Sequence, residues 1–132
     1  MTKKVKILLV DDNKAFVEAV SAVLSFRDDV EVIGIAYDGT EFLELFKKCS
    51  PNVVLMDINM PNMDGIMATR KGLIEDNKIK VIGVTMADSV DIHLDMLHFG
   101  FSGGIQKDLF TQQFDEALKA VLNGEVYFPL LC

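Results

Sequence analysis

With 132 residues, half of them apolar, the chain has the length of one domain and needs no disulfide to hold a core. Its formal net charge of −7 argues against a nucleic-acid-binding face, and its apolar runs fall well short of the ~20 residues of a membrane helix. Cys49 and Cys132 stand alone, outside any zinc or disulfide pattern, which is typical of a reducing compartment. We therefore expect one domain, from the length of the chain, located in the cytoplasm.

Two periodicities alternate along the chain. Short runs of aliphatic and β-branched residues predict strands, and the segments between them have the 3.6-residue period of amphipathic helices. The predicted strands cover residues 5–10, 30–36, 53–56, 80–84 and 103–106. The residues expected to begin the helices are Asn13, Thr40, Asp64, Ser89 and Thr111.

Strict alternation of strands and helices predicts an α/β fold with a doubly wound parallel sheet. In such open sheets ligands bind at the carboxyl ends of the strands. Polar residues stand at four of these ends: Asp11 and Asp12 after the first strand, Asp57 after the third, Thr85 after the fourth and Lys107 after the fifth.

These side chains together predict a phosphoryl-transfer site. At ~5 Å and an effective dielectric near 20, each pair of carboxylates repels by about 3 kcal/mol, so a cation must offset the cluster. Oxygen ligands shared with water and phosphate favour Mg²⁺. With Lys107 as a fixed positive charge and Thr85 as a hydroxyl donor, Asp57 can be the nucleophile that forms an acyl phosphate. Each residue alone has a purely structural explanation, such as a helix cap or an ion pair. Their combination at one edge of the sheet favours the phosphoryl-transfer site.

The same residues resemble the receiver domain of two-component response regulators. The acidic pair at 11–12, the run DINMPNMDG at 57–65, Thr85 and Lys107 match its motifs in order and spacing over essentially all 132 residues. The resemblance implies that residues 1–132 form one phosphoacceptor domain with a flavodoxin-like (βα)5 fold and strand order 2-1-3-4-5. It also implies that the chain is no enzyme beyond taking phosphoryl groups from donors and losing them slowly.

The resemblance further implies a role for each site residue. Asp57 would accept a phosphoryl group from a phosphohistidine on a sensor histidine kinase. Asp12 and Asp57 would bind Mg²⁺ directly, Asp11 would bind it through a water, and Asn59 would bind it through its backbone carbonyl.

A conformational switch is implied as well. Lys107 would pair with Asp57 and then with the phosphoryl oxygens, and the Thr85 hydroxyl would turn toward the phosphoryl group and move the loop and helix at 87–99. Many receivers carry an aromatic residue three positions before the lysine. Here that place is Gly104, which argues against an aromatic-rotamer switch.

The pair Lys107-Asp108 and the run at 123–128 are similar to receivers of NarL/LuxR-type DNA-binding regulators. This resemblance implies transcription as the output, a helix-turn-helix domain after this chain, and DNA contact only through that domain. It also implies a homodimer on phosphorylation, through the fourth and fifth helices or else the first and fifth.

Two other functions fit part of the pattern. A haloacid-dehalogenase-like phosphatase also forms an aspartyl phosphate, but it usually needs a second Asp where this chain has Asn59. A pseudo-receiver that serves only as an interaction module would fit Gly104, although every phosphorylation residue is present. His93 and His98, which have no partner ligands nearby in sequence, are expected to be surface residues of the fourth helix.

Overall fold

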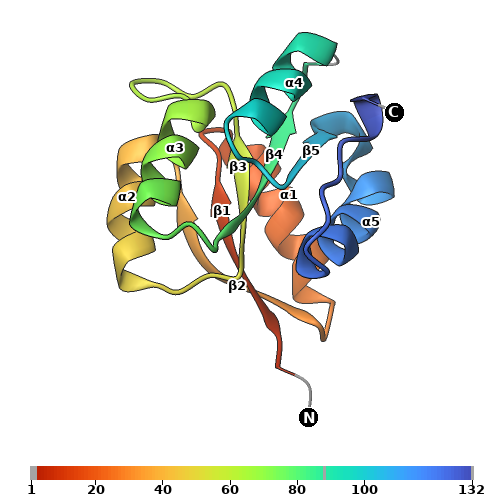
Figure 1. Cartoon of the computed structure of the whole chain (residues 1–132). Helices are drawn as coiled ribbons and strands as arrows, with labels where there is room; N and C mark the ends of the chain where they lie inside the picture. Colours follow the sequence, from red (N-terminus) through yellow and green to blue (C-terminus); the bar gives the residue numbers. More distant parts are fainter. Residues whose placement is uncertain (1–2, 88, 132) are drawn as a thin grey trace.

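The computed structural model describes residues 3–87 and 89–131 of the chain (Figure 1). The strands are β1 (Val5–Val10), β2 (Val30–Ala36), β3 (Val53–Asp57), β4 (Lys80–Thr85) and β5 (Gly103–Gln106). The helices are α1 (Lys14–Ser25), α2 (Gly39–Lys48), α3 (Gly65–Glu75), α4 (Val90–His98) and α5 (Phe110–Leu122), with short 3-10 turns at η1 (Lys107–Leu109) and η2 (Pro129–Leu131). None of the helices in the described ranges has the length and hydrophobicity that a bilayer crossing requires.

The five strands form one parallel sheet in the order β2-β1-β3-β4-β5. This order confirms the predicted flavodoxin-like α/β fold. The chain winds one way from β1 to β2 and the other way from β3 onward, so the connections leave the sheet on opposite faces at β1 and β3. A crevice therefore opens at the carboxyl ends of these two strands.

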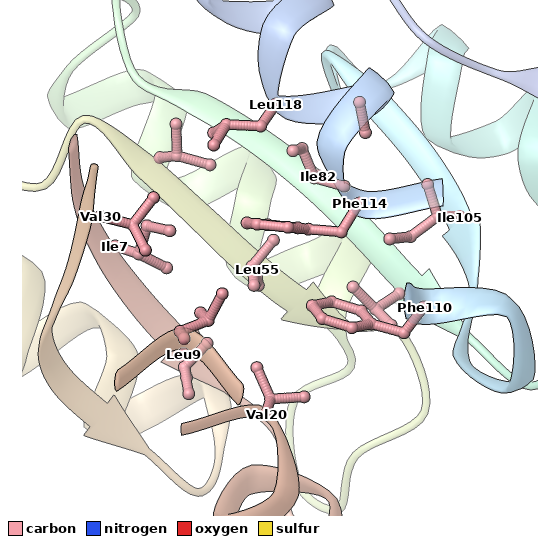
Figure 2. Packing of buried hydrophobic residues seen from close by; sticks show 14 of the residues in the cluster. Ile7, Leu9, Val20, Val30, Leu55, Ile82, Ile105, Phe110, Phe114 and Leu118 are labelled. Atoms are coloured by element: carbon pink, nitrogen blue, oxygen red, sulfur yellow. The ribbon is translucent and has the colours of Figure 1, made fainter. Parts of the chain in front are cut away.

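Helices cover both faces of the sheet because successive strand side chains point to opposite sides. Ile7 and Leu9 pack with α1 and α5, and Figure 2 shows this cluster, in which strand side chains meet Phe110, Phe114 and Leu118 of α5. Leu8 and Val10 belong instead to the cluster formed with α2, α3 and α4. Two packed layers thus hold the central strands rigidly, which fixes the positions of the residues at their ends.

Two of the predicted helix starts were wrong by one or two residues. The N-cap of α2 is Asp38, whose carboxylate accepts a hydrogen bond from the Glu41 N–H at 2.8 Å, while the Glu41 side chain accepts one from the Tyr37 N–H. This reciprocal pair provides acceptors for two backbone N–H groups at the start of α2, and an N-cap at Thr40 would leave both of them without these acceptors. Helix α5 begins at Phe110 rather than Thr111, because the 3-10 turn η1 leads directly into it.

Candidate functional site

Parallel strands bring the predicted site residues to one edge of the sheet. Asp11 directly follows β1, Asp57 and Thr85 are the last residues of β3 and β4, and Lys107 follows β5. The sequence placed the ends of β3 and β4 one residue earlier, whereas Asp57 and Thr85 are both paired with the neighbouring strand. Their backbones are therefore held by the sheet and not by a mobile loop.

The three predicted acids converge in space. One carboxylate oxygen from each of Asp11, Asp12 and Asp57 lies within 4.8 Å of the other two. Asp11 and Asp57 are buried and Asp12 is exposed, so the cluster is closed toward the core and open toward solvent. Hard oxygen donors with one open side fit Mg²⁺, which keeps several of its waters when it binds to proteins. The donor set therefore fits the predicted metal.

Lys107 lies across the same carboxylates. Its Nζ is 2.8 Å from Oδ2 of Asp11 and 3.7 Å from Oδ2 of Asp57, and it lies over the Phe16 ring at 4.8 Å from the centroid. The sequence predicted a pair with Asp57, but the tighter contact is with Asp11. A cation over an aromatic face is stabilised there, so Phe16 of α1 helps to hold the ammonium at this position.

Asp57 is in an environment that disfavours its negative charge. Burial raises the pKa of Asp57 to about 7, the neighbouring Asp11 carboxylate adds to the rise, and Lys107 and the Asn59 backbone amide only partly oppose it. Added positive charge at the cluster relieves this cost, whether it comes as a proton or as a divalent cation. Such a shift in a crevice is typical of a functional carboxylate.

Thr85 is completely buried, and its Oγ1 accepts a hydrogen bond from the Ala87 N–H at 3.1 Å. A hydroxyl that accepts in this way still has its own proton to donate. Thr85 therefore links the edge of the sheet to the backbone of the loop before α4. A hydrogen-bond acceptor added near this edge could accept a hydrogen bond from its hydroxyl.

The β3–α3 loop is fixed by Gly65, the last residue of the run at 57–65. The Gly65 N–H donates to the Ile58 carbonyl at 2.8 Å, and a Cβ at Gly65 would lie 2.0 Å from the Asp57 backbone oxygen. Only glycine allows the start of α3 to lie this close to β3. Asn59, which the sequence predicted to be a ligand through its carbonyl, is an exposed residue of this loop.

His93 was wrongly predicted to be a surface residue. It is completely buried under α4, whereas His98 on the same helix is exposed. A signal was available in the sequence, because His93 and Met96 are three residues apart and share one helical face. The apolar residues Val90, Leu94 and Leu97 suggested a different inward face, and they are the exposed ones.

Comparisons with known proteins agree with this site. A family model described as the response regulator receiver domain matches residues 7–119. The transcriptional regulatory protein DegU of Brevibacillus brevis is 34% identical over 94% of this chain and 52% of its own length. The oxygen regulatory protein NreC of Staphylococcus carnosus is 32% identical over 92% of this chain and 57% of its own length. The chain thus spans little more than half of these relatives.

Solved structures share the fold closely. A LuxR-family two-component response regulator from Aurantimonas sp. SI85-9A1 superposes with a TM-score of 0.89 at 27% identity, covering 95% of this chain and 89% of that chain. The signal receiver domain assigned to the response regulator NarL of Mycobacterium tuberculosis gives a TM-score of 0.86 at 31% identity, over 94% of this chain and all of that one.

Proposed function

The chain belongs to the family of response regulator receiver domains, and on this basis we propose that Asp57 accepts a phosphoryl group from a phosphohistidine of a sensor histidine kinase. The convergence of Asp11, Asp12 and Asp57 opposite Lys107 is the observation that carries the proposal. As a receiver, the chain is the acceptor in a phosphotransfer reaction and not an enzyme.

The chemistry follows from the positions of the side chains. A carboxylate oxygen of Asp57 attacks phosphorus, the P–N bond of the phosphohistidine breaks, and the imidazole leaves as an acyl phosphate forms. Mg²⁺ held by Asp12 and Asp57, by Asp11 through water and by the Asn59 carbonyl would neutralise charge on the phosphoryl oxygens. The Lys107 ammonium, already between the two buried acids, is placed to bind a phosphoryl oxygen.

An open groove beside the site offers a place for the kinase. It lies between α1 and the start of α5, and Lys107 is one of its lining residues. Its other lining residues are mostly apolar: Phe16, Ala19, Val20, Val23, Asp108, Phe110 and Thr111. A kinase helix that carries the phosphohistidine would bury this lining and bring its imidazole to the open side of the acidic cluster.

Phosphorylation then changes the loop after β4. The phosphoryl group adds negative charge and acceptor oxygens, and the Thr85 hydroxyl gains a charge-assisted hydrogen bond only in that state. Turning toward Asp57 would cost the Thr85 hydroxyl its bond from Ala87, so the loop and α4 shift to a second arrangement.

We propose transcription as the output, in the cytoplasm. The transcriptional relatives, of which this chain spans little more than half, support a following helix-turn-helix domain, and DNA would be contacted only through it. A homodimer would form on phosphorylation, through the α4–α5 face or else the α1–α5 face. Exposed Val90, Leu94 and Leu97 on α4 favour the first of these.

The proposed function predicts a covalent adduct. Incubation with acetyl phosphate and Mg²⁺ should add the mass of one phosphoryl group to the intact chain, and EDTA should prevent the addition. Sustained hydrolysis of p-nitrophenyl phosphate at ordinary enzyme rates would favour the phosphatase alternative. An unmodified chain under these conditions would favour a pseudo-receiver that acts only as an interaction module.

The metal site predicts a stability change. Because Mg²⁺ binds the folded acidic cluster, it should raise the unfolding temperature as RT ln(1 + [Mg²⁺]/Kd) requires. Asp12→Asn should weaken Mg²⁺ binding by about tenfold or more, measured by titration calorimetry. Asp28→Asn, which removes the same charge from an exposed site outside the cluster, is the matched control and should bind Mg²⁺ like the parent chain. Equal affinities in the two variants would contradict the assigned ligands.

A further inference from the structure

The last described segment, residues 125–131, folds back onto the sheet, and we refer to it as the C-terminal strap. Helix α5 ends at Leu122, and Gly124, two residues later, has a φ of +80° that suits glycine. The Gly124 N–H donates to the Val121 carbonyl and the Glu125 N–H donates to the Ala120 carbonyl, and these paired bonds close the helix. This cap turns the chain toward β5. Figure 1 shows the strap, in dark blue, running beside that strand.

The strap is hydrogen-bonded to the edge of the sheet. The Gly104 N–H donates to the Tyr127 carbonyl at 2.9 Å, the Tyr127 N–H donates to the Ser102 carbonyl at 2.9 Å, and Tyr127 forms a parallel bridge with Gly103. The 3-10 turn η2 then packs against both α4 and β5. Because β5 is an edge strand, the strap occupies backbone groups that would otherwise face solvent.

Gly104 is the point at which α4, β5 and the strap meet. A Cβ at this position would lie 2.8 Å from Cε of Met96, 2.9 Å from Cδ1 of Phe128 and 3.0 Å from Nδ1 of His93. All three side chains are buried. The space that an aromatic residue fills in many receivers is therefore filled here by side chains of α4 and of the strap. The strap thus packs directly against α4, the helix that is expected to move.

His93 connects this contact to the site. Among the described residues, neither of its ring nitrogens has a hydrogen-bond partner. Burial lowers the pKa of His93, because it disfavours the charged form of the ring. Ala87 is the residue whose N–H binds the Thr85 hydroxyl. His93 belongs to α4, whose first residue, Val90, follows Ala87 by three positions. A shift of Ala87 that moves the start of α4 would therefore carry the His93 ring with it.

We propose that the C-terminal strap undocks from β5 when Asp57 is phosphorylated, and that His93 is the positioning residue that couples the two. The inference rests on the proposed function, because it takes phosphorylation of Asp57 as its trigger. When Thr85 turns to the phosphoryl group, Ala87 moves, the His93 ring follows, and Phe128 loses the packed position over Gly104. By reciprocity, a docked strap lowers the affinity of the site for a phosphoryl analogue by the same factor.

Amide hydrogen exchange at Gly104 tests this in the unaltered chain. The Gly104 N–H is bonded to the strap, so its exchange rate reports docking directly. Beryllofluoride with Mg²⁺ should raise that rate by about tenfold, a typical size for such coupling, while amides in the middle of β3 stay protected. Binding of the analogue is followed separately by fluorine NMR.

Three different results would contradict the proposed function, the undocking of the strap or the role of His93. If the analogue binds and Gly104 exchange is unchanged, the strap inference fails and the proposed function stands. If the analogue does not bind at all, both fail. If His93→Leu binds the analogue and Gly104 still responds, His93 is not the coupling residue. His98→Leu, on the exposed side of α4, is the matched control and should respond like the parent chain.

The reverse direction offers a second measurement. Phe128→Ala removes strap packing over Gly104 without touching the acidic cluster, so it should tighten beryllofluoride binding by a few-fold. Unchanged binding in this variant, with Gly104 exchange raised, would show that docking and the site are independent, and weaker binding would show coupling of the opposite sign. Either result would contradict the proposal.

Discussion

Asp57→Asn should abolish phosphoryl uptake and at the same time make the metal-free fold more stable. The first effect follows because an amide oxygen is a poor nucleophile, so acetyl phosphate should leave the variant unmodified. The second follows because the substitution removes a buried charge that lies beside another carboxylate. A substitution that removes function and raises stability is typical of a functional site in which like charges are buried side by side at the expense of folding stability.

The dependence on pH has a definite sign. The pKa of Asp57 in the folded chain is raised from 3.8 to about 7, so its charge costs stability above about pH 7, and that cost disappears as the pH falls toward 4. In EDTA at about pH 8, Asp57→Asn should therefore be more stable than the parent by about 1–3 kcal/mol, and the gap should close near pH 4.

Urea unfolding measures this difference. Mg²⁺ should stabilise the parent chain and narrow the gap, because it offsets the charge that the variant lacks. Asp28→Asn removes the same formal charge at an exposed position and should change stability by less than about 0.5 kcal/mol. An Asp57→Asn variant that is less stable than the parent in EDTA at high pH would contradict the assigned environment of Asp57.

Gly65→Ala should destabilise the chain by about 3 kcal/mol or more. Its Cβ would lie 2.0 Å from the Asp57 backbone oxygen and 2.9 Å from Cα of Ile58, and both atoms belong to the backbone, which cannot rotate away. Relief requires the start of α3 to move off β3, which also displaces the loop that carries Asn59. We therefore expect slower phosphorylation as well as a lower unfolding midpoint in urea.

Gly72→Ala is the matched control for this prediction. It makes the same substitution in the same helix, but the nearest neighbours of its Cβ would be two side-chain rings, Phe42 at 3.2 Å and Phe46 at 3.8 Å. Alanine also favours the helix by about 1 kcal/mol, which offsets the tighter contact, so stability should change by less than about 1 kcal/mol. If both variants lose the same stability, the close approach at Gly65 is not what sets its cost.

The sequence alone predicted the fold and which residues converge at the site. Both were readable because they depend on local signals: alternating periodicities define the strands, and a parallel sheet brings the residues after those strands to one edge. Asp11, Asp12, Asp57 and Lys107 therefore converge as predicted. Local cap signals at Asn13 and Asp64 were likewise correct, as both side chains accept a bond from the helix that they begin.

Only the tertiary structure decided which side chains share a space. Lys107 lies over the ring of Phe16, which is distant in sequence, and is nearer to Asp11 than to Asp57. His93 is buried because Gly104 leaves room for a side chain from another element, and the strap completes that contact. The period of the sequence does not predict these contacts, because they join residues that are far apart along the chain. Each contact depends on the distance between backbones, which is set only when the sheet and the helices pack.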